Sequence, residues 1–505
     1  MRGKKALKNI ISSLTLQIVT VICGLIVPRL IIKSFGSNVN GLITSITQFL
    51  GYITLLESGF GPVVKSILYK PIASKNKEEI AKILRASEKF FRIISYIFIA
   101  YIVILCLVIP TIVSNEFNTL FTLSLVIIIA ISIFAEYYFG MTYRLYLQAE
   151  QKTYVTSIIQ IGTTILNTIM IVILIKFGAN IHSVKLISAL IFIFKPILQN
   201  IYVRKKYNIN LKNAETGYRI KQKWDGLAQH IAAVIHSNTD VVILTLFTNT
   251  LEVSVYSVYW LVVNSIKKLV QSLTGGIEAS FGDMIAKGER ENLNKSFRAY
   301  ESFYFTIITI IFSCTLILIL PFVTIYTKGI TDVNYYRPAF AYLIVLAEFM
   351  WTMRLPYSSV TLAAGHFKQT KKGAWLEASI NIVLSAILVF KFGLIGVAIG
   401  TLVAMIIRTI EFMYHTSKYI LERSIWHTYK RLIAVAIQVT IILLITQFIP
   451  MTNVTDYAQW TVKALIVAVI SGTVVITLNC ILYKNDIKDV LNIIKRILFR
   501  KKENK

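Results

Sequence analysis

Some fourteen long apolar segments fill the chain between Asn9 and Tyr483, and most of its Lys and Arg lie in alternate gaps between them. A bilayer core about 30 Å thick is crossed by roughly twenty residues of helix, each rising 1.5 Å. Only a helix, or a closed barrel, satisfies its own backbone hydrogen bonds in lipid. The pattern therefore predicts an all-α polytopic membrane protein, and its function must depend on groups held at membrane depth.

The expected spans fall into three sets. The first six are Asn9–Ile32, Leu42–Val64, Phe91–Val113, Leu120–Tyr143, Tyr154–Ile175 and Val184–Val203. The next six are Leu227–Phe247, Val253–Leu273, Tyr300–Ile325, Phe340–Pro356, Ala374–Phe390 and Leu394–Tyr414. The terminal pair is Leu432–Ile449 and Trp460–Leu482.

The charges predict the orientation of these spans. Forty of the 53 Lys and Arg lie in alternate gaps and at the two ends: the N-terminus, 65–92, 144–153, 204–226, 282–298, 364–373, 415–431 and 484–505. Basic loops stay on the cytoplasmic side, so both termini should be cytoplasmic. The mixed-charge stretch within 65–92 is expected to lie along the inner membrane surface.

The net charge of +28 would ordinarily suggest a nucleic-acid partner. Here the basic residues occupy short loops, and no basic soluble domain is present to bind nucleic acid. Anionic membrane lipids are the expected contacts instead. The four cysteines all lie in apolar segments without metal-ligand spacing, so we expect no metal site and no cofactor.

An internal repeat divides the spans. Ala135-Glu136-Tyr137 in the fourth span recurs 212 positions later as Ala347-Glu348-Phe349 in the tenth, and similar sequences follow each copy. Six spans per copy is an even number, so both copies insert with the same orientation. The expected organisation is an N-lobe at 1–203, a cytoplasmic loop at 204–226, a C-lobe at 227–414, and a last pair of spans with a basic tail at 415–505.

Charges at membrane depth are costly and normally functional. Cations suit a phosphate-bearing anion, because a guanidinium pairs with phosphate bidentately at low dielectric. Carboxylates could carry a coupling proton or bind sodium. The candidates for diphosphate binding are Arg29, Lys195, Lys267, Arg354 and Arg408, and those for ion coupling are Glu57, Glu136, Asp240 and Glu348.

Each of these charges also has a structural interpretation. Lys195 and Lys267 can extend toward the headgroups, and Glu57 lies beside a Gly-Phe-Gly-Pro break where water can reach it. Arg408 and Glu411 are three apart on one helix face and can pair with each other. An Arg29–Asp240 pair between the halves is another alternative.

Several segments resemble a known family. VPRLIIKSFGSNVNGLI, LLESGFGPVVKSIL, LQAEQK, TDVVILTLF and INIVLSAILVFKFGLIGVAIGTLV are similar to polysaccharide flippases of the O-antigen, capsule and teichuronic acid type. These belong to the multidrug/oligosaccharidyl-lipid/polysaccharide (MOP) superfamily. The resemblance implies a MATE-like fold of two six-helix lobes plus two C-terminal helices in a bacterial cytoplasmic membrane. Arg29 matches the cation that the family tends to keep in its first span, and Asp240 the acid common in its seventh.

The resemblance also implies a function. Such a protein turns an undecaprenyl-diphosphate-linked oligosaccharide across the membrane by alternating access, with a polyprenyl-linked glycan as substrate and other polysaccharide-assembly proteins as partners. One alternative is a MATE-like drug or cation antiporter, which the excess of intramembrane cations disfavours. Another is a membrane glycosyltransferase or polymerase, which needs acidic catalytic groups and a long outer loop. The outer gaps here are short, so we expect a transporter rather than an enzyme.

Overall fold

The computed structural model describes residues 2–57, 60–207, 227–272, 277–451 and 454–490. These residues form helices without any strand. Within these residues, twelve helical segments are long and apolar enough to cross a membrane. Some of these segments, such as Thr119–Ala149, consist of consecutive helices. The two remaining expected spans correspond to α10, whose apolar part is the shorter Ala233–Phe247, and to α11. The predicted all-α polytopic fold is confirmed.

By their internal contacts the residues divide into two compact units, Met1–Ser257 with Ile330–Val333 (unit 1) and Val258–Gly329 with Asn334–Lys505 (unit 2). Unit 1 contains α1 (Arg2–Phe35), α2 (Ser37–Gly51), α3 (Thr54–Glu57), α4 (Phe60–Ala73), α5 (Lys77–Ile112), α6 (Thr119–Ala135), the π-helical η1 (Glu136–Gly140), α7 (Met141–Ala149), α8 (Thr153–Lys176), α9 (Ile181–Tyr207), α10 (Leu227–Phe247) and the start of α11 (Thr250–Ser272). Unit 2 contains the rest of α11, then α12 (Ile277–Ala286), α13 (Arg290–Tyr326), α14 (Pro338–Met353), α15 (Leu355–Ala363), α16 (Lys371–Phe392), α17 (Leu394–Tyr419), α18 (Trp426–Thr446) and α19 (Tyr457–Leu482).

The lobe boundary expected at 204–226 stays a prediction. The division between the two compact units follows from internal contacts. It falls inside α11, because α10 packs against α2 in unit 1. The start of α11 also approaches α2 closely: a Cβ on Gly41 would lie 1.8 Å from the carbonyl oxygen of Thr250. Glycine at position 41 is what allows this contact. Most of the expected inter-lobe loop, 208–226, and the end of the basic tail, 491–505, lie outside the described residues.

The stretch expected to lie along the inner surface is instead the beginning of a spanning helix. The Asn76 side chain accepts a hydrogen bond from the Glu79 N–H at 3.0 Å, which begins α5. From there apolar residues at helical spacing, including Ile80, Leu84 and Phe91, are buried without interruption. α5 therefore runs for 36 residues, and its counterpart in unit 2, α13, for 37.

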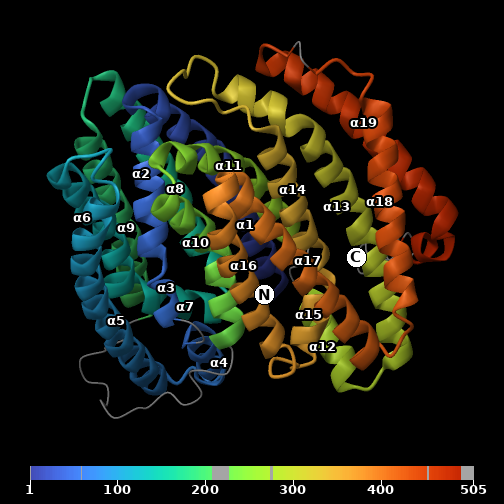
Figure 1. Cartoon of the computed structure of the whole chain (residues 1–505). Coiled ribbons are helices and arrows are strands. Elements are labelled where there is room, and N and C mark those ends of the chain that lie inside the picture. Colours follow the sequence, from blue (N-terminus) through green and yellow to red (C-terminus); the bar gives the residue numbers. More distant parts are fainter. Residues whose placement is uncertain (1, 58–59, 208–226, 273–276, 452–453, 491–505) are drawn as a thin grey trace. The chain divides into compact units, whose positions relative to one another are not determined.

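Within unit 2, α18 and α19 both pack against α13 (Figure 1). The remaining core of the unit forms where α17 contacts α14 and α16. In unit 1 the ring of Phe60 stacks on Phe90, with centroids 3.6 Å apart, and meets Phe91 edge-on at 5.4 Å. These contacts fix α4 on α5, beside the span that contains η1.

Candidate functional site

The fourth span of unit 1 contains a π-helical turn at Glu136–Gly140, between α6 and α7. Such turns hold one extra residue and often occur at functional sites. Opposite this turn, α9 carries Pro196 in its interior, and a Cβ on Gly140 would lie 2.6 Å from the Cβ of Pro196. Gly140 therefore brings α9 close enough for Lys195 to reach Glu136.

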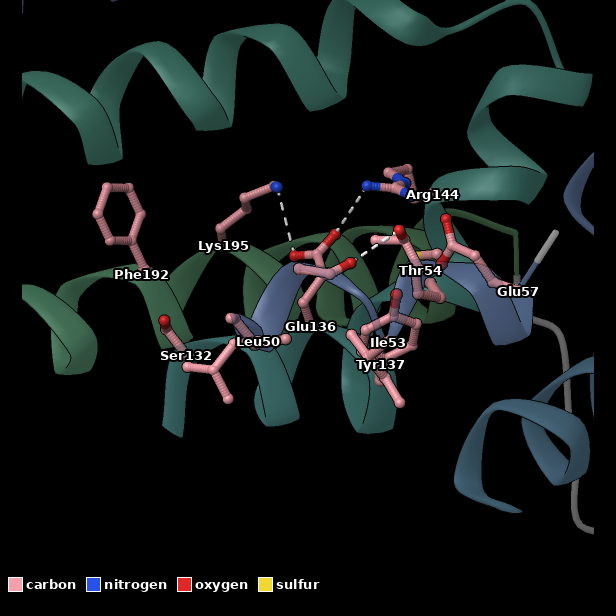
Figure 2. Close-up of a pocket in the computed structure, with 13 residues that line it drawn as sticks. Leu50, Ile53, Thr54, Glu57, Ser132, Glu136, Tyr137, Arg144, Phe192 and Lys195 are labelled. Carbon is pink, nitrogen blue, oxygen red and sulfur yellow. Dashed lines mark hydrogen bonds and ion pairs between the residues drawn. The ribbon is translucent and has the colours of Figure 1, made fainter. Parts of the chain in front are cut away.

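Glu136 holds two cations. Its Oε1 lies 3.2 Å from Nη1 of Arg144, and its Oε2 lies 3.3 Å from Nζ of Lys195 (Figure 2). Eight residues of regular α-helix, at about 100° each, would leave Glu136 and Arg144 roughly 80° apart around the axis. The extra residue of the π-turn reduces this to about 20°, so both side chains point the same way.

These charges line a cavity of about 330 Å³ in unit 1 (Figure 2). Its walls come from α2, α3, the α6–η1–α7 span and α9, with Glu57, Tyr137 and Phe192 beside the ion pairs. Oε2 of Glu57 and Nε of Arg144 are buried, and neither forms a hydrogen bond with the described residues. A buried acceptor and a buried donor of this kind are normally satisfied by water or by a ligand.

The second copy of the repeat pairs its charges differently. Oε2 of Glu348 lies 2.8 Å from Nζ of Lys267, and that ammonium also lies 4.0 Å from the ring centroid of Trp351. Six residues, not eight, separate Glu348 from Arg354, which places them on different faces of the span. Nη1 of Arg354 accordingly lies 2.8 Å from Oε1 of Glu377 on α16.

Arg408 completes this network in unit 2. Only 1% of its side chain is exposed, and it contacts Glu377 at 3.2 Å and Glu411 at 2.5 Å. The alternative that Arg408 and Glu411 pair is confirmed. Arg408 also donates to the carbonyl oxygen of Thr370 at 3.1 Å.

The sequence suggested a cleft between the halves lined by cations in excess, and this stays a prediction. Within the two units, the candidate cations have carboxylate partners. Lys195, Lys267, Arg354 and Arg408 each lie within 3.3 Å of a carboxylate. The charges that line the cavity of unit 1 are two carboxylates and two cations. The diphosphate-binding role of these cations stays a prediction, and it now requires that substrate exchange with a carboxylate.

The two charges highlighted by the family resemblance are not among the residues that line this cavity. Arg29 is half-buried on α1, one residue after Pro28. Asp240 is 2% exposed on α10 and accepts a hydrogen bond from the hydroxyl of Tyr256 at 3.1 Å. Neither lines the cavity of unit 1.

A second duplicated constellation was not found from the sequence. In unit 1 the hydroxyl of Tyr143 donates to Glu88 at 2.6 Å and accepts from Arg204 at 2.9 Å. In unit 2 the hydroxyl of Tyr357 donates to Glu301, which also accepts from Arg423 at 2.6 Å. We call these the Glu88 clamp and the Glu301 clamp.

A short sequence signal marks both clamps. Ala86-Ser87-Glu88-Lys89-Phe90 recurs 213 positions later as Ala299-Tyr300-Glu301-Ser302-Phe303. Both glutamates lie near the basic ends of their helices, where a charge attracts less attention than one at mid-membrane. Arg144 and Glu377 were likewise missed as site residues, because each lies close to the end of an expected span.

Comparisons with known proteins show which solved structures share this fold. No protein-family model matches the chain, and no curated protein matches it. Among solved structures, the lipid II flippase MurJ in an inward closed conformation matches with a TM-score of 0.68 and 16% identity, over 94% of this chain and 99% of that one. An inward-facing multidrug resistance MATE family transporter matches with a TM-score of 0.64 and 12% identity, over 81% and 97%.

This chain has the MOP superfamily fold. A MOP superfamily transporter from Pyrococcus furiosus, whose structure is described as having a binding pocket of reverse polarity, also matches with a TM-score of 0.52 and 13% identity over 83% of this chain. At these identities the likeness concerns the fold alone. Together with the twelve apolar helices it indicates a multi-pass membrane protein.

Proposed function

We propose that the chain is a flippase for a polyprenyl-diphosphate-linked oligosaccharide in a bacterial cytoplasmic membrane. Two findings support this: the fold is that of a lipid II flippase, and the cavity of unit 1 holds two cations on a single carboxylate. The cavity is the main support for the proposal, because Lys195 and Arg144 lie close enough together in it to bind one anionic group. The polysaccharide class of the substrate follows from the sequence resemblance.

The binding step we propose is an exchange of anions. A diphosphate entering the cavity takes the place of the Glu136 carboxylate on Lys195 and Arg144, so the cations are never left bare at low dielectric. Arg144 contacts Glu136 through Nη1, and a phosphate can accept from the same guanidinium group bidentately. The polyprenyl tail stays in lipid, which limits the desolvated part of the substrate to its head.

The displaced carboxylate then needs a partner of its own. A proton or a sodium ion neutralises Glu136 or Glu57 once the diphosphate has entered, and this links substrate binding to an ion gradient. In unit 2 the same exchange is available at Lys267, Arg354 and Arg408 during alternating access. Arg29 and Asp240 remain candidates for later steps of the transport cycle.

The test is a flipping assay in proteoliposomes with a fluorescent polyprenyl-diphosphate oligosaccharide. Lys195→Gln removes one charge-assisted contact of about 2 kcal/mol, which corresponds to a loss of about 30-fold in initial rate. Lys195→Arg restores most of the rate, and Arg290→Gln, at an exposed ion pair with Glu422, leaves it unchanged. Full activity in Lys195→Gln and in Arg144→Gln would refute the exchange.

A second candidate function rests on Glu57. A buried carboxylate oxygen without a partner among the described residues, beside Tyr137 and Phe192, also suits an organic cation. The two functions respond differently to substitution: Glu57→Gln abolishes cation export by an antiporter, whereas in a flippase it leaves diphosphate binding intact and can alter only the coupling to an ion gradient. Export of a cationic dye that depends on Glu57, without any flipping of the polyprenyl substrate, would favour the antiporter.

A further inference from the structure

The two clamps are built alike but are covered differently. In unit 2, Glu301 is 2% exposed and receives a second arginine, Arg431 of α18, at 3.4 Å. Arg431 also forms an ion pair, at 2.6 Å, with Asp486, which follows α19. The Glu301 clamp is thus enclosed by the last two spans of the chain.

The Glu88 clamp is open by comparison. Arg204 and Arg92 lie 3.7 and 3.8 Å from the carboxylate oxygens of Glu88, beyond ordinary hydrogen-bond distance. Their side chains are 54% and 47% exposed, whereas that of Arg423 in the other copy is 9% exposed. Two guanidinium groups therefore flank one carboxylate at the surface of unit 1.

An apolar stripe continues from Arg92 along the same face of α5. Tyr96, Val103 and Leu107 are 58%, 57% and 69% exposed. Their counterparts 213 positions later on α13 are Thr309, Leu316 and Leu320, which are 0%, 5% and 7% exposed in the helix that α18 and α19 contact. The duplication thus identifies one helix face that is buried in unit 2 and exposed in unit 1.

We propose that this face of unit 1 binds an anionic phospholipid, with its phosphodiester between Arg92 and Arg204 and an acyl chain along Tyr96, Val103 and Leu107. The eleven helical steps from Tyr96 to Leu107 rise about 16 Å, close to half of a hydrocarbon core about 30 Å thick. Arg92 lies about 30 Å along α5 from its end at Ile112, and Arg204 lies in the last turn of α9. The basic loops predict this side to be cytoplasmic, which puts both arginines at the depth of the inner headgroups.

The charges favour a lipid over a protein partner for this face. Guanidinium groups bind phosphate bidentately, and Glu88 compensates only one of the two charges. The apolar stripe begins one turn from Arg92, so the headgroup contact and the chain contact belong to a single amphipathic ligand. The site is separate from the cavity of unit 1, which neither Arg92 nor Arg204 lines.

Native mass spectrometry of the full chain in detergent tests the proposal, with phosphatidylglycerol and phosphatidylethanolamine of identical acyl chains as probes. The wild type should retain phosphatidylglycerol at least tenfold more than phosphatidylethanolamine. Arg92→Gln with Arg204→Gln should remove this preference, and the double lysine variant should keep it. Arg290→Gln with Lys295→Gln, which removes two exposed cations from unit 2, should leave it unchanged.

The Glu88→Gln variant should change lipid retention in the opposite direction from the arginine variants. Removing the carboxylate that competes with phosphate should raise phosphatidylglycerol retention, whereas a purely structural clamp predicts no gain. Equal retention of both lipids by the wild type overturns the proposal. The proposal also fails if the unit 2 control variant loses its preference for phosphatidylglycerol as fully as the arginine double variant does. Displacement of phosphatidylglycerol by a polyprenyl phosphate would also overturn it, by assigning the face to the transported substrate.

Discussion

Replacing Glu301 with Gln should destabilise unit 2 far more than the matched change at Glu88 destabilises unit 1. Glu301 is 2% exposed and accepts from Arg423 at 2.6 and 3.1 Å, so its loss leaves a buried guanidinium without its carboxylate. Breaking a buried ion pair from one side costs about 3–5 kcal/mol. At Glu88 the arginines are half-exposed, and such pairs contribute about 0–1 kcal/mol.

The assay is the apparent melting temperature of the purified protein in detergent, compared at one scan rate because unfolding of such proteins is commonly irreversible. For a cooperative unit of about 250 residues, 1 kcal/mol corresponds to roughly 2 °C, so Glu301→Gln should lower the temperature by about 6–10 °C. Glu88→Gln, which also weakens the contact with Tyr143, should lower it by no more than about 4 °C.

A second substitution tests whether the lost stability comes from the unpaired Arg423 guanidinium or from a general disturbance of packing. Arg423→Met added to Glu301→Gln removes the uncompensated guanidinium and should recover at least half of the lost stability. Equal shifts at Glu301 and Glu88, or a double variant no more stable than Glu301→Gln alone, would refute the argument from burial.

Two further predictions concern packing and pairing inside the units. Gly140→Ala places a Cβ 2.6 Å from that of Pro196, so it should separate α9 from η1 and reduce flipping in proteoliposomes at least tenfold, while Gly162→Ala, with open space around it, should not. Lys267→Met or Glu348→Gln alone should each lower the apparent melting temperature by the equivalent of about 3 kcal/mol, and the double variant should be more stable than either. Additive losses in the double variant would contradict a coupled pair.

The sequence predicted the membrane fold well because length and hydropathy decide it. Roughly twenty apolar residues at a time cannot be stable in another arrangement within a bilayer. The Ala-Glu-aromatic repeat located two glutamates that the structure places in ion pairs, Glu136 and Glu348. Boundaries were less accurate where a helix continues past the apolar region, as α5 does through the charged residues 77–92.

The sequence could not predict which charged residues on different helices pair with each other. An intramembrane cation can be recognised from one segment, but its counter-charge lies on another helix, as Glu377 does for Arg354 and Arg408. The π-turn at Glu136–Gly140 is equally hidden, because nothing in EYYFG distinguishes it from regular helix. The candidate cations were therefore identified from the sequence, and their pairing with carboxylates on other helices only from the structure. The approach of the start of α11 to α2 depends similarly on a contact at Gly41 between distant segments.

The lengths of α5 and α13 have a consequence for the part of each helix that lies beyond its apolar region. At 1.5 Å per residue both helices extend about 54 Å, some 20 Å more than the hydrocarbon core requires. The excess falls in the first turns of each helix, where the charged residues of 77–92 and 290–301 lie. In the flippase that we propose, the sugar chain of a substrate on that side would contact these turns before it reached the lipid headgroups.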